Sequence, residues 1–132
     1  MKVLVLSAAV LLVAQQVSCA PPPGFIMRCM HENGVTGADA IKFAETGEAS
    51  DGMKCNFKCI MMEAGVMTPE GKLLLSPMLE HVPEKIHQAF KDCVEIEPSS
   101  DLCDLAFRHN VCLREKATDF YKAMVKKRNE SE

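Results

Sequence analysis

The segments CNFKC (residues 55–59) and CDLAFRHNVC (residues 103–112) carry four of the six cysteines that follow residue 20. Cys55 and Cys59 are four residues apart, so on a helix they point outward from one face, and each should bridge to another helix. Cys103 and Cys112 are nine residues apart, which at about 100° per residue places them on opposite sides of one helix. The last helix should therefore be tied to two different neighbours, while the pairing itself stays open.

The N-terminus predicts export. Lys2 precedes an apolar run, residues 3–14, which is shorter than the roughly 20 residues that a membrane span needs, and small or polar residues follow up to Ala20. This is the pattern of a secretory signal peptide cleaved between residues 18 and 20. We therefore expect residues 1–20 to be removed and residues 21–132 to form one secreted, extracellular domain with a C-terminal tail at 113–132.

Several functions are disfavoured by composition and motifs. Without Lys2 the chain has 14 basic and 18 acidic side chains, which gives no basic face for nucleic acid. Zinc is disfavoured because the C-x3-C segment has no second close cysteine pair and the predicted compartment is oxidising. The sequence has no G-x-S-x-G, H-E-x-x-H, P-loop or dinucleotide-binding motif, so we expect no enzyme, no catalytic residue, no cofactor and no metal.

The local patterns predict an all-α protein of about six helices. Apolar residues recur at helical spacing, most clearly over residues 84–95, and no stretch alternates as a β-strand would. Thr36, Asp51 and either Ser99 or Ser100 are the expected helix caps, and Thr68-Pro69-Glu70-Gly71 fits a type I turn. The expected helices are 25–31, 38–45, 51–64, one from 76 that ends before Pro83, 84–95 and 101–116.

These features resemble the insect odorant-binding protein family. The resemblance rests on the signal peptide, the small helical mature chain, the C-x3-C and C-x8-C spacings and the segment GVMTPEGKL (residues 65–73), which is similar to the family's loop between its third and fourth helices. It covers nearly all of the mature chain. The 33 residues between Cys59 and Cys93 are a few fewer than in most members, in the region of the fourth helix. The resemblance implies a compact bundle around an internal apolar cavity, with bridges Cys29–Cys59, Cys55–Cys103 and Cys93–Cys112.

For function, the resemblance implies a secreted carrier that binds and solubilises small hydrophobic ligands such as odorants or pheromones. A membrane receptor for delivery is a further partner implied in this way, and a monomer or a weak homodimer is expected. The alternative from another class is a secreted helical signalling or interaction protein with a solid core and a receptor-facing patch.

The ligand is expected to be apolar or weakly polar. The mature chain has eight methionines, whose flexible thioethers adapt to irregular apolar shapes, but no tryptophan and one tyrosine, so a pocket would hold few polar groups. Ordinary core packing explains any single methionine or phenylalanine equally well. The expected lining residues are Phe57, Met61, Leu75, Met78, Leu79, Val82, Phe90, Val94, Phe107, Val111, Phe120 and Tyr121.

Two further features have alternative interpretations. The tail after Cys112 is amphipathic, and it either continues the last helix or folds back to line or plug the cavity. The four histidines could change charge between about pH 5 and pH 8, and the resemblance singles out His81 as a candidate for acid-triggered release. For each histidine, however, a solvated surface position is the favoured interpretation.

Overall fold

The structure, a computed structural model, describes residues 24–130, and the expected signal peptide lies outside this range. The described part has seven α-helices, one short 3-10 helix and no β-strand, apart from an isolated bridge between Met67 and Leu73. The prediction of an all-α fold is confirmed. The elements are α2 (Phe25–Glu32), α3 (Gly37–Thr46), α4 (Asp51–Glu63), α5 (Leu75–Leu79), η1 (Glu84–Ile86), α6 (His87–Cys93), α7 (Leu102–Lys116) and α8 (Thr118–Glu130).

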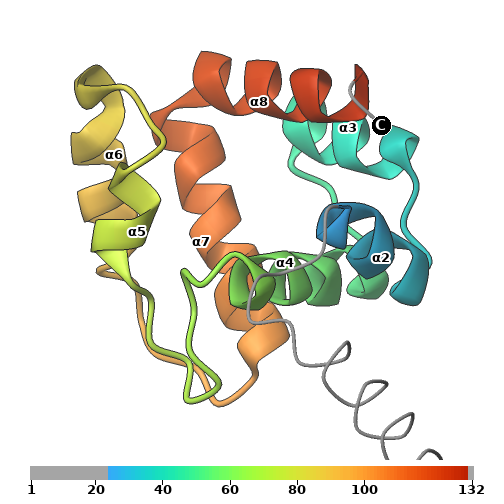
Figure 1. The fold of residues 1–132 in the computed structure, drawn as a ribbon, viewed down its shortest axis with the longest axis horizontal. Coiled ribbons are helices and arrows are strands. Elements are labelled where there is room, and N and C mark those ends of the chain that lie inside the picture. Colours follow the sequence, from blue (N-terminus) through green and yellow to red (C-terminus); the bar gives the residue numbers. More distant parts are fainter. Residues whose placement is uncertain (1–23, 131–132) are drawn as a thin grey trace, which may run out of the picture.

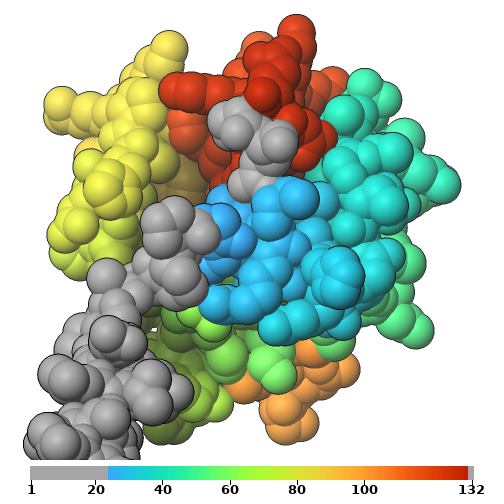
Figure 2. All heavy atoms as spheres, turned by 45° about the vertical axis from the view of Figure 1, so that its right-hand side comes forward, coloured from blue at the N-terminus to red at the C-terminus, as the bar shows by residue number. Residues whose placement is uncertain are grey.

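The helices are arranged around α7 and α4, which cross each other (Figure 1). α2 packs on α4, and α5 and α6 lie together on one side of α7. α8 leaves the end of α7 and runs along α3. Figure 2 shows α2 and α3 on the same side of the molecule, with α8 above them.

Side-chain caps fix where three of the helices begin. Thr36 caps α3, as predicted. It forms a capping box with Asp39, in which the amide of Asp39 donates to Thr36 Oγ1 and the amide of Thr36 donates to the Asp39 carboxylate. Ser50, not Asp51, caps α4, because its hydroxyl accepts from the amide of Met53. Asp51 is the first helical residue, where its negative charge suits the helix N-terminus.

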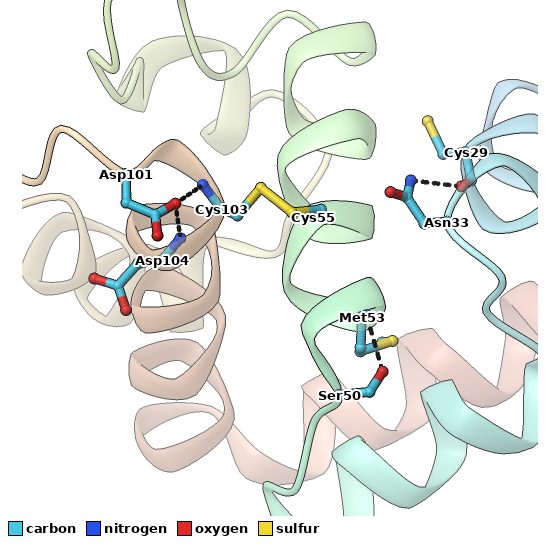
Figure 3. The surroundings of a disulfide bond; sticks show 8 residues. All are labelled: Cys29, Asn33, Ser50, Met53, Cys55, Asp101, Cys103 and Asp104. Atoms are coloured by element: carbon cyan, nitrogen blue, oxygen red, sulfur yellow. Dashed lines mark hydrogen bonds between the residues drawn. A yellow bond between two sulfur atoms is a disulfide. The ribbon is translucent and has the colours of Figure 1, made fainter.

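The cap of α7 also differs from the prediction. Asp101 is the capping residue, and its carboxylate accepts from the amides of Cys103 and Asp104 (Figure 3). Ser99 lies two residues before Asp101 in the chain, and its hydroxyl accepts a hydrogen bond from the amide of Asp101. A carboxylate satisfies two of the amides that the first turn leaves without partners, so α7 begins at Leu102.

Residues 84–95 do not form one continuous helix. The chain leaves Pro83 in an extended conformation, makes the 3-10 turn η1 and becomes α-helical only at His87. α6 then ends at Cys93. The preceding helix, α5, has five residues and ends before Pro83 as predicted. The turn at residues 68–71 is closed by the amide of Gly71, which donates to the carbonyl of Thr68.

Three disulfides hold this arrangement, and they pair the cysteines as the resemblance implied. Cys29–Cys59 joins α2 to α4, Cys55–Cys103 joins α4 to the start of α7 (Figure 3), and Cys93–Cys112 joins α6 to α7. The two cysteines of the C-x3-C segment therefore bridge to different helices. The two cysteines of α7 also reach two different neighbours, so both geometric expectations are confirmed.

The tail does not continue α7. Residues 113–116 complete that helix, its regular geometry is interrupted at Ala117 (φ −136°, ψ 53°), and α8 follows as a separate helix. Tyr121 and Val125 of α8 are buried in the core, where the Tyr121 ring meets Phe43 with ring centroids 5.8 Å apart. The tail thus folds back onto the bundle and supplies part of its core.

Candidate ligand pocket

A cavity of about 300 Å³ lies among α4, α5, α6, α7 and α8. Most of its wall is apolar, and its polar side chains are Glu80, His81, His109, Asn110 and Arg128. Other hollows on the described part of the chain border fewer apolar side chains; one lies over Met27 and Met30 beside the end of α8. The cavity among the five helices is therefore the candidate ligand site, and we call it the pocket.

Five of the twelve residues expected to line a pocket do so. Phe57 and Met61 come from α4, Met78 from α5, Val82 from the segment after it and Phe90 from α6. Four of them are buried, and Val82 is half-buried. Their elements are distant in sequence, and the Cys93–Cys112 bridge holds α6 against α7 to bring them together.

The other seven expected residues do not border this pocket. Six of them are half-buried and pack against the core: Leu75, Leu79, Val94, Phe107, Val111 and Phe120. Phe107 packs beside Lys54, whose amine lies 4.6 Å from the ring centroid. Tyr121 is buried, and it borders a separate small cavity. On α7, the two residues that were expected from their hydrophobicity, Phe107 and Val111, thus lie outside the face that borders this pocket.

The face of α7 toward the pocket carries His109, Asn110 and Leu113. Together with Ala106 they follow the i, i+3, i+4, i+7 spacing of one helix face, so helical periodicity was the signal that could have found them. The remaining lining residues, which were not among the twelve expected, are Ile60, Ala64, Val66, Pro77, Glu80, His81, Met124 and Arg128. Met124 and Arg128 show that α8 contributes to the wall.

His109 is buried, with 2% of its surface exposed, so the expectation of a surface position is wrong for this histidine. Its Nδ1 lies 2.8 Å from the carbonyl oxygen of Cys93. Burial lowers the pKa of His109, although the hydrogen bond to Cys93 acts in the opposite direction. His81, by contrast, is exposed and borders the pocket from the segment after α5.

Both the amide nitrogen and the amide oxygen of the Asn110 side chain have hydrogen-bond partners. Its amide donates to the carbonyl of Ala106 at 2.9 Å and to the Met61 sulfur at 3.5 Å, and its Oδ1 accepts from the Tyr121 hydroxyl at 2.8 Å. These bonds tie α7 to α4 and to α8 behind the pocket wall.

A much smaller cavity of about 20 Å³ lies between Asn56, Phe57 and Tyr121, among other residues. It borders Phe57, Ile60 and Arg128, which also border the pocket. Asn56 is buried, with 2% of its surface exposed, and within residues 24–130 its Oδ1 is the one sealed side-chain polar atom without a hydrogen-bond partner. The volume suits about one water molecule.

The described residues show neither a metal site nor a membrane-spanning helix. No group of three or more His, Cys, Asp or Glu side chains is placed to hold a metal ion. None of the helices at residues 24–130 combines the length and the apolar character that a membrane crossing requires.

An all-helical bundle framed by three bridges defines the class of odorant-binding-type proteins, and comparison places the chain within it. The PBP/GOBP family matches residues 23–116, and the chain belongs to this family. The match ends with the last residue of α7, so α8 lies beyond it. No curated protein matches the chain in sequence.

A solved structure shows the same fold. The crystal structure of the medfly odorant-binding protein CcapOBP22/CcapOBP69a is similar with a TM-score of 0.63 and 21% sequence identity. The similarity covers 77% of this chain and 92% of that chain. At this identity the likeness concerns the fold.

Proposed function

We propose that the protein is a secreted carrier that binds and solubilises small hydrophobic molecules, of the kind of odorants or pheromones, in the pocket among α4, α5, α6, α7 and α8. The observation that carries this proposal is the pocket itself, about 300 Å³ in volume with a mostly apolar wall. This volume lies at the lower end of the range of small-molecule sites. Family membership and the fold of the medfly odorant-binding protein support the same function.

The energetics suit a reversible carrier. Burial of about 300 Å² of ligand surface at roughly 25 cal/mol/Å² contributes about 7.5 kcal/mol before the costs of association. Affinities near micromolar correspond to about −8 kcal/mol. Because the costs of association are still to be subtracted, a pocket of this kind would hold an apolar molecule with an affinity no tighter than about micromolar and release it on dilution.

The disulfide frame supports this use of the fold. A domain with an internal space gives up close packing and loses stability for it. Each bridge stabilises the folded state by about 3 to 4 kcal/mol in the chain-entropy model, although the three loops overlap and their contributions do not add. The loops span 30, 48 and 19 residues. The covalent frame can therefore hold the helices around a space that packing alone would close.

The pocket also favours a carrier over a signalling protein with a solid core, which would have no such space. Secretion, delivery to a membrane receptor, and a monomeric or weakly dimeric state belong to the same proposal. No catalytic residue and no cofactor is required for it.

Fluorescent titration with the apolar probe N-phenylnaphthylamine tests this function. The wild-type protein should take up the probe with an affinity near micromolar, and long-chain aliphatic molecules should displace it. Met124→Trp, which fills the pocket from α8, should weaken uptake at least about tenfold, because it removes the space that the probe would occupy. The matched control is Lys122→Trp, since Lys122 is exposed on the same helix. Absence of uptake by the folded wild-type protein would overturn the proposal.

A further inference from the structure

We infer that the pocket selects ligands that donate a hydrogen bond, namely alcohols and phenols, and that Nε2 of His109 is the acceptor that selects them. This inference rests on the carrier function proposed above and names the ligand class for the same pocket. Three features of the pocket support it. Nδ1 of His109 carries the proton, and Nε2 has no hydrogen-bond partner among residues 24–130. The other polar side chains that border the pocket are already hydrogen-bonded, exposed, or able only to donate.

The bond between His109 and Cys93 determines the tautomer. Nδ1 lies 2.8 Å from the carbonyl oxygen of Cys93, and a carbonyl oxygen can only accept a hydrogen bond. Nδ1 must therefore carry the proton. In the neutral ring the second nitrogen, Nε2, then has no hydrogen and presents a lone pair.

Nε2 of His109 is an open acceptor beside the pocket. No residue among 24–130 makes a hydrogen bond to Nε2. In that range, the one completely buried side-chain polar atom without a hydrogen-bond partner is Asn56 Oδ1. Within the part of the chain that the structure describes, Nε2 is thus an unpaired atom that is not completely buried. His109 borders the pocket, which provides the space from which Nε2 can be reached.

None of the other polar side chains that border the pocket provides a buried hydrogen-bond acceptor without a partner, as Nε2 of His109 does. The Asn110 Oδ1 already accepts from Tyr121, and the Asn110 amide already donates to two partners. Glu80 and His81 are exposed residues near the segment after α5. Arg128 carries only donors. Among the side chains that border the pocket, His109 therefore contributes the buried acceptor.

Burial keeps this acceptor in its neutral form. It lowers the pKa of His109, so the ring stays unprotonated at neutral pH. Glu80, His81 and Arg128 are the other titratable or charged groups that border the pocket. An unprotonated Nε2 can bond to the hydroxyl of an alcohol or a phenol. Ethers, esters, ketones and aldehydes have no O–H or N–H to offer it and would leave it unpaired.

The test compares two isomers, decanol and nonyl methyl ether, as competitors for bound N-phenylnaphthylamine. They have the same atoms and differ in whether the oxygen carries a hydrogen. We expect the alcohol to bind the wild-type protein about three to ten times more tightly, the range for one hydrogen bond. His109→Asn should remove this preference, because the shorter amide can still donate to the Cys93 carbonyl but has no group at the place of Nε2. The control is His31→Asn, since His31 is exposed on α2 and does not border the pocket.

The outcomes separate this inference from the carrier function. If neither isomer displaces the probe and the probe itself does not bind, the proposed function fails. If both isomers displace it equally well, or if His109→Asn keeps the preference for the alcohol, the inference is overturned and the carrier function stands. Nitrogen NMR of the imidazole provides a measurement that needs no variant. The Nε2 resonance of His109 should shift when decanol is added to the wild-type protein, and an unchanged resonance at saturation would contradict the inference.

Discussion

The imidazole of His109 donates from Nδ1 to the carbonyl oxygen of Cys93 across 2.8 Å, and Cys93 is also the residue whose sulfur is bonded to Cys112. His109 and Cys112 lie three residues apart on α7. One residue of α6 is therefore held to α7 twice, by a covalent bond and by a hydrogen bond. This double connection places Phe90 of α6 and His109 of α7 on the wall of the same pocket.

This connection predicts that the three bridges differ in their effect on binding. Cys93→Ser with Cys112→Ser should destabilise the protein by about 3 kcal/mol and also weaken probe uptake, because α6 is no longer fixed at the pocket wall. Cys29→Ser with Cys59→Ser should cost a similar amount of stability, but it releases α2, which does not border the pocket. Denaturant unfolding and probe titration measure the two effects separately. Equal loss of uptake in two folded double variants would contradict the role given to α6.

The buried His109 also predicts how stability depends on pH. Its pKa is lowered in the folded state, so below about pH 6.5 the unfolded chain takes up a proton that the folded protein resists. The free energy of unfolding should therefore fall as the pH falls from about 6.5 toward the folded pKa, by up to about 1.4 kcal/mol for each pH unit. Above this range the contribution of the neutral ring is fully present.

The variant His109→Asn isolates this contribution, because it keeps a donor toward Cys93 and cannot titrate. Denaturant unfolding at about pH 7 and about pH 5 should show a smaller loss of stability for His109→Asn than for the wild-type protein. Glu80, His81 and Arg128, which also border the pocket, are the same in both proteins. Equal losses of unfolding free energy in the two proteins would show that His109 does not cause the pH dependence of stability.

A substitution at Asn56 should raise the stability of the protein rather than lower it. Its buried Oδ1 has no hydrogen-bond partner among the described residues, and an unpaired buried polar group costs about 1 to 3 kcal/mol. Asn56→Leu has nearly the same shape and removes that cost, so it should raise the midpoint of thermal unfolding by several degrees. Differential scanning calorimetry measures the change. A lower midpoint would indicate that Asn56 is satisfied by a water molecule in the small cavity beside Tyr121.

Much of the fold was predictable because helix signals and cysteine spacing are local. Thr36 indicated the start of α3, because threonine is a common capping residue, and the four-residue spacing of Cys55 and Cys59 indicated that each bridges to another helix. The caps of α4 and α7 were misplaced by one or two residues. In both segments serine and aspartate stand close together, and either residue type can accept from the first free amides.

The pocket was less predictable, because it depends on how each helix is rotated and where the tail turns. Phe107 and Val111 are more hydrophobic than His109 and Asn110, yet the latter pair borders the pocket. The interruption at Ala117 has no strong sequence signal, since alanine favours helix, and the contribution of Met124 depends on that turn. The burial of His109 could not be predicted either, since its partner is a backbone carbonyl on another helix.

NMR of isotope-labelled methionine methyl groups tests the central claim most directly, because the methionines are spread over the whole structure. Met61, Met78 and Met124 border the pocket, whereas Met27 is half exposed on α2 and lies in the separate hollow beside the end of α8. When decanol is added to the wild-type protein, we predict saturable shifts of the methyl resonances of Met61, Met78 and Met124 and little change at Met27. Shifts centred on Met27, or no shift of the three pocket methionines at saturating decanol, would contradict the account.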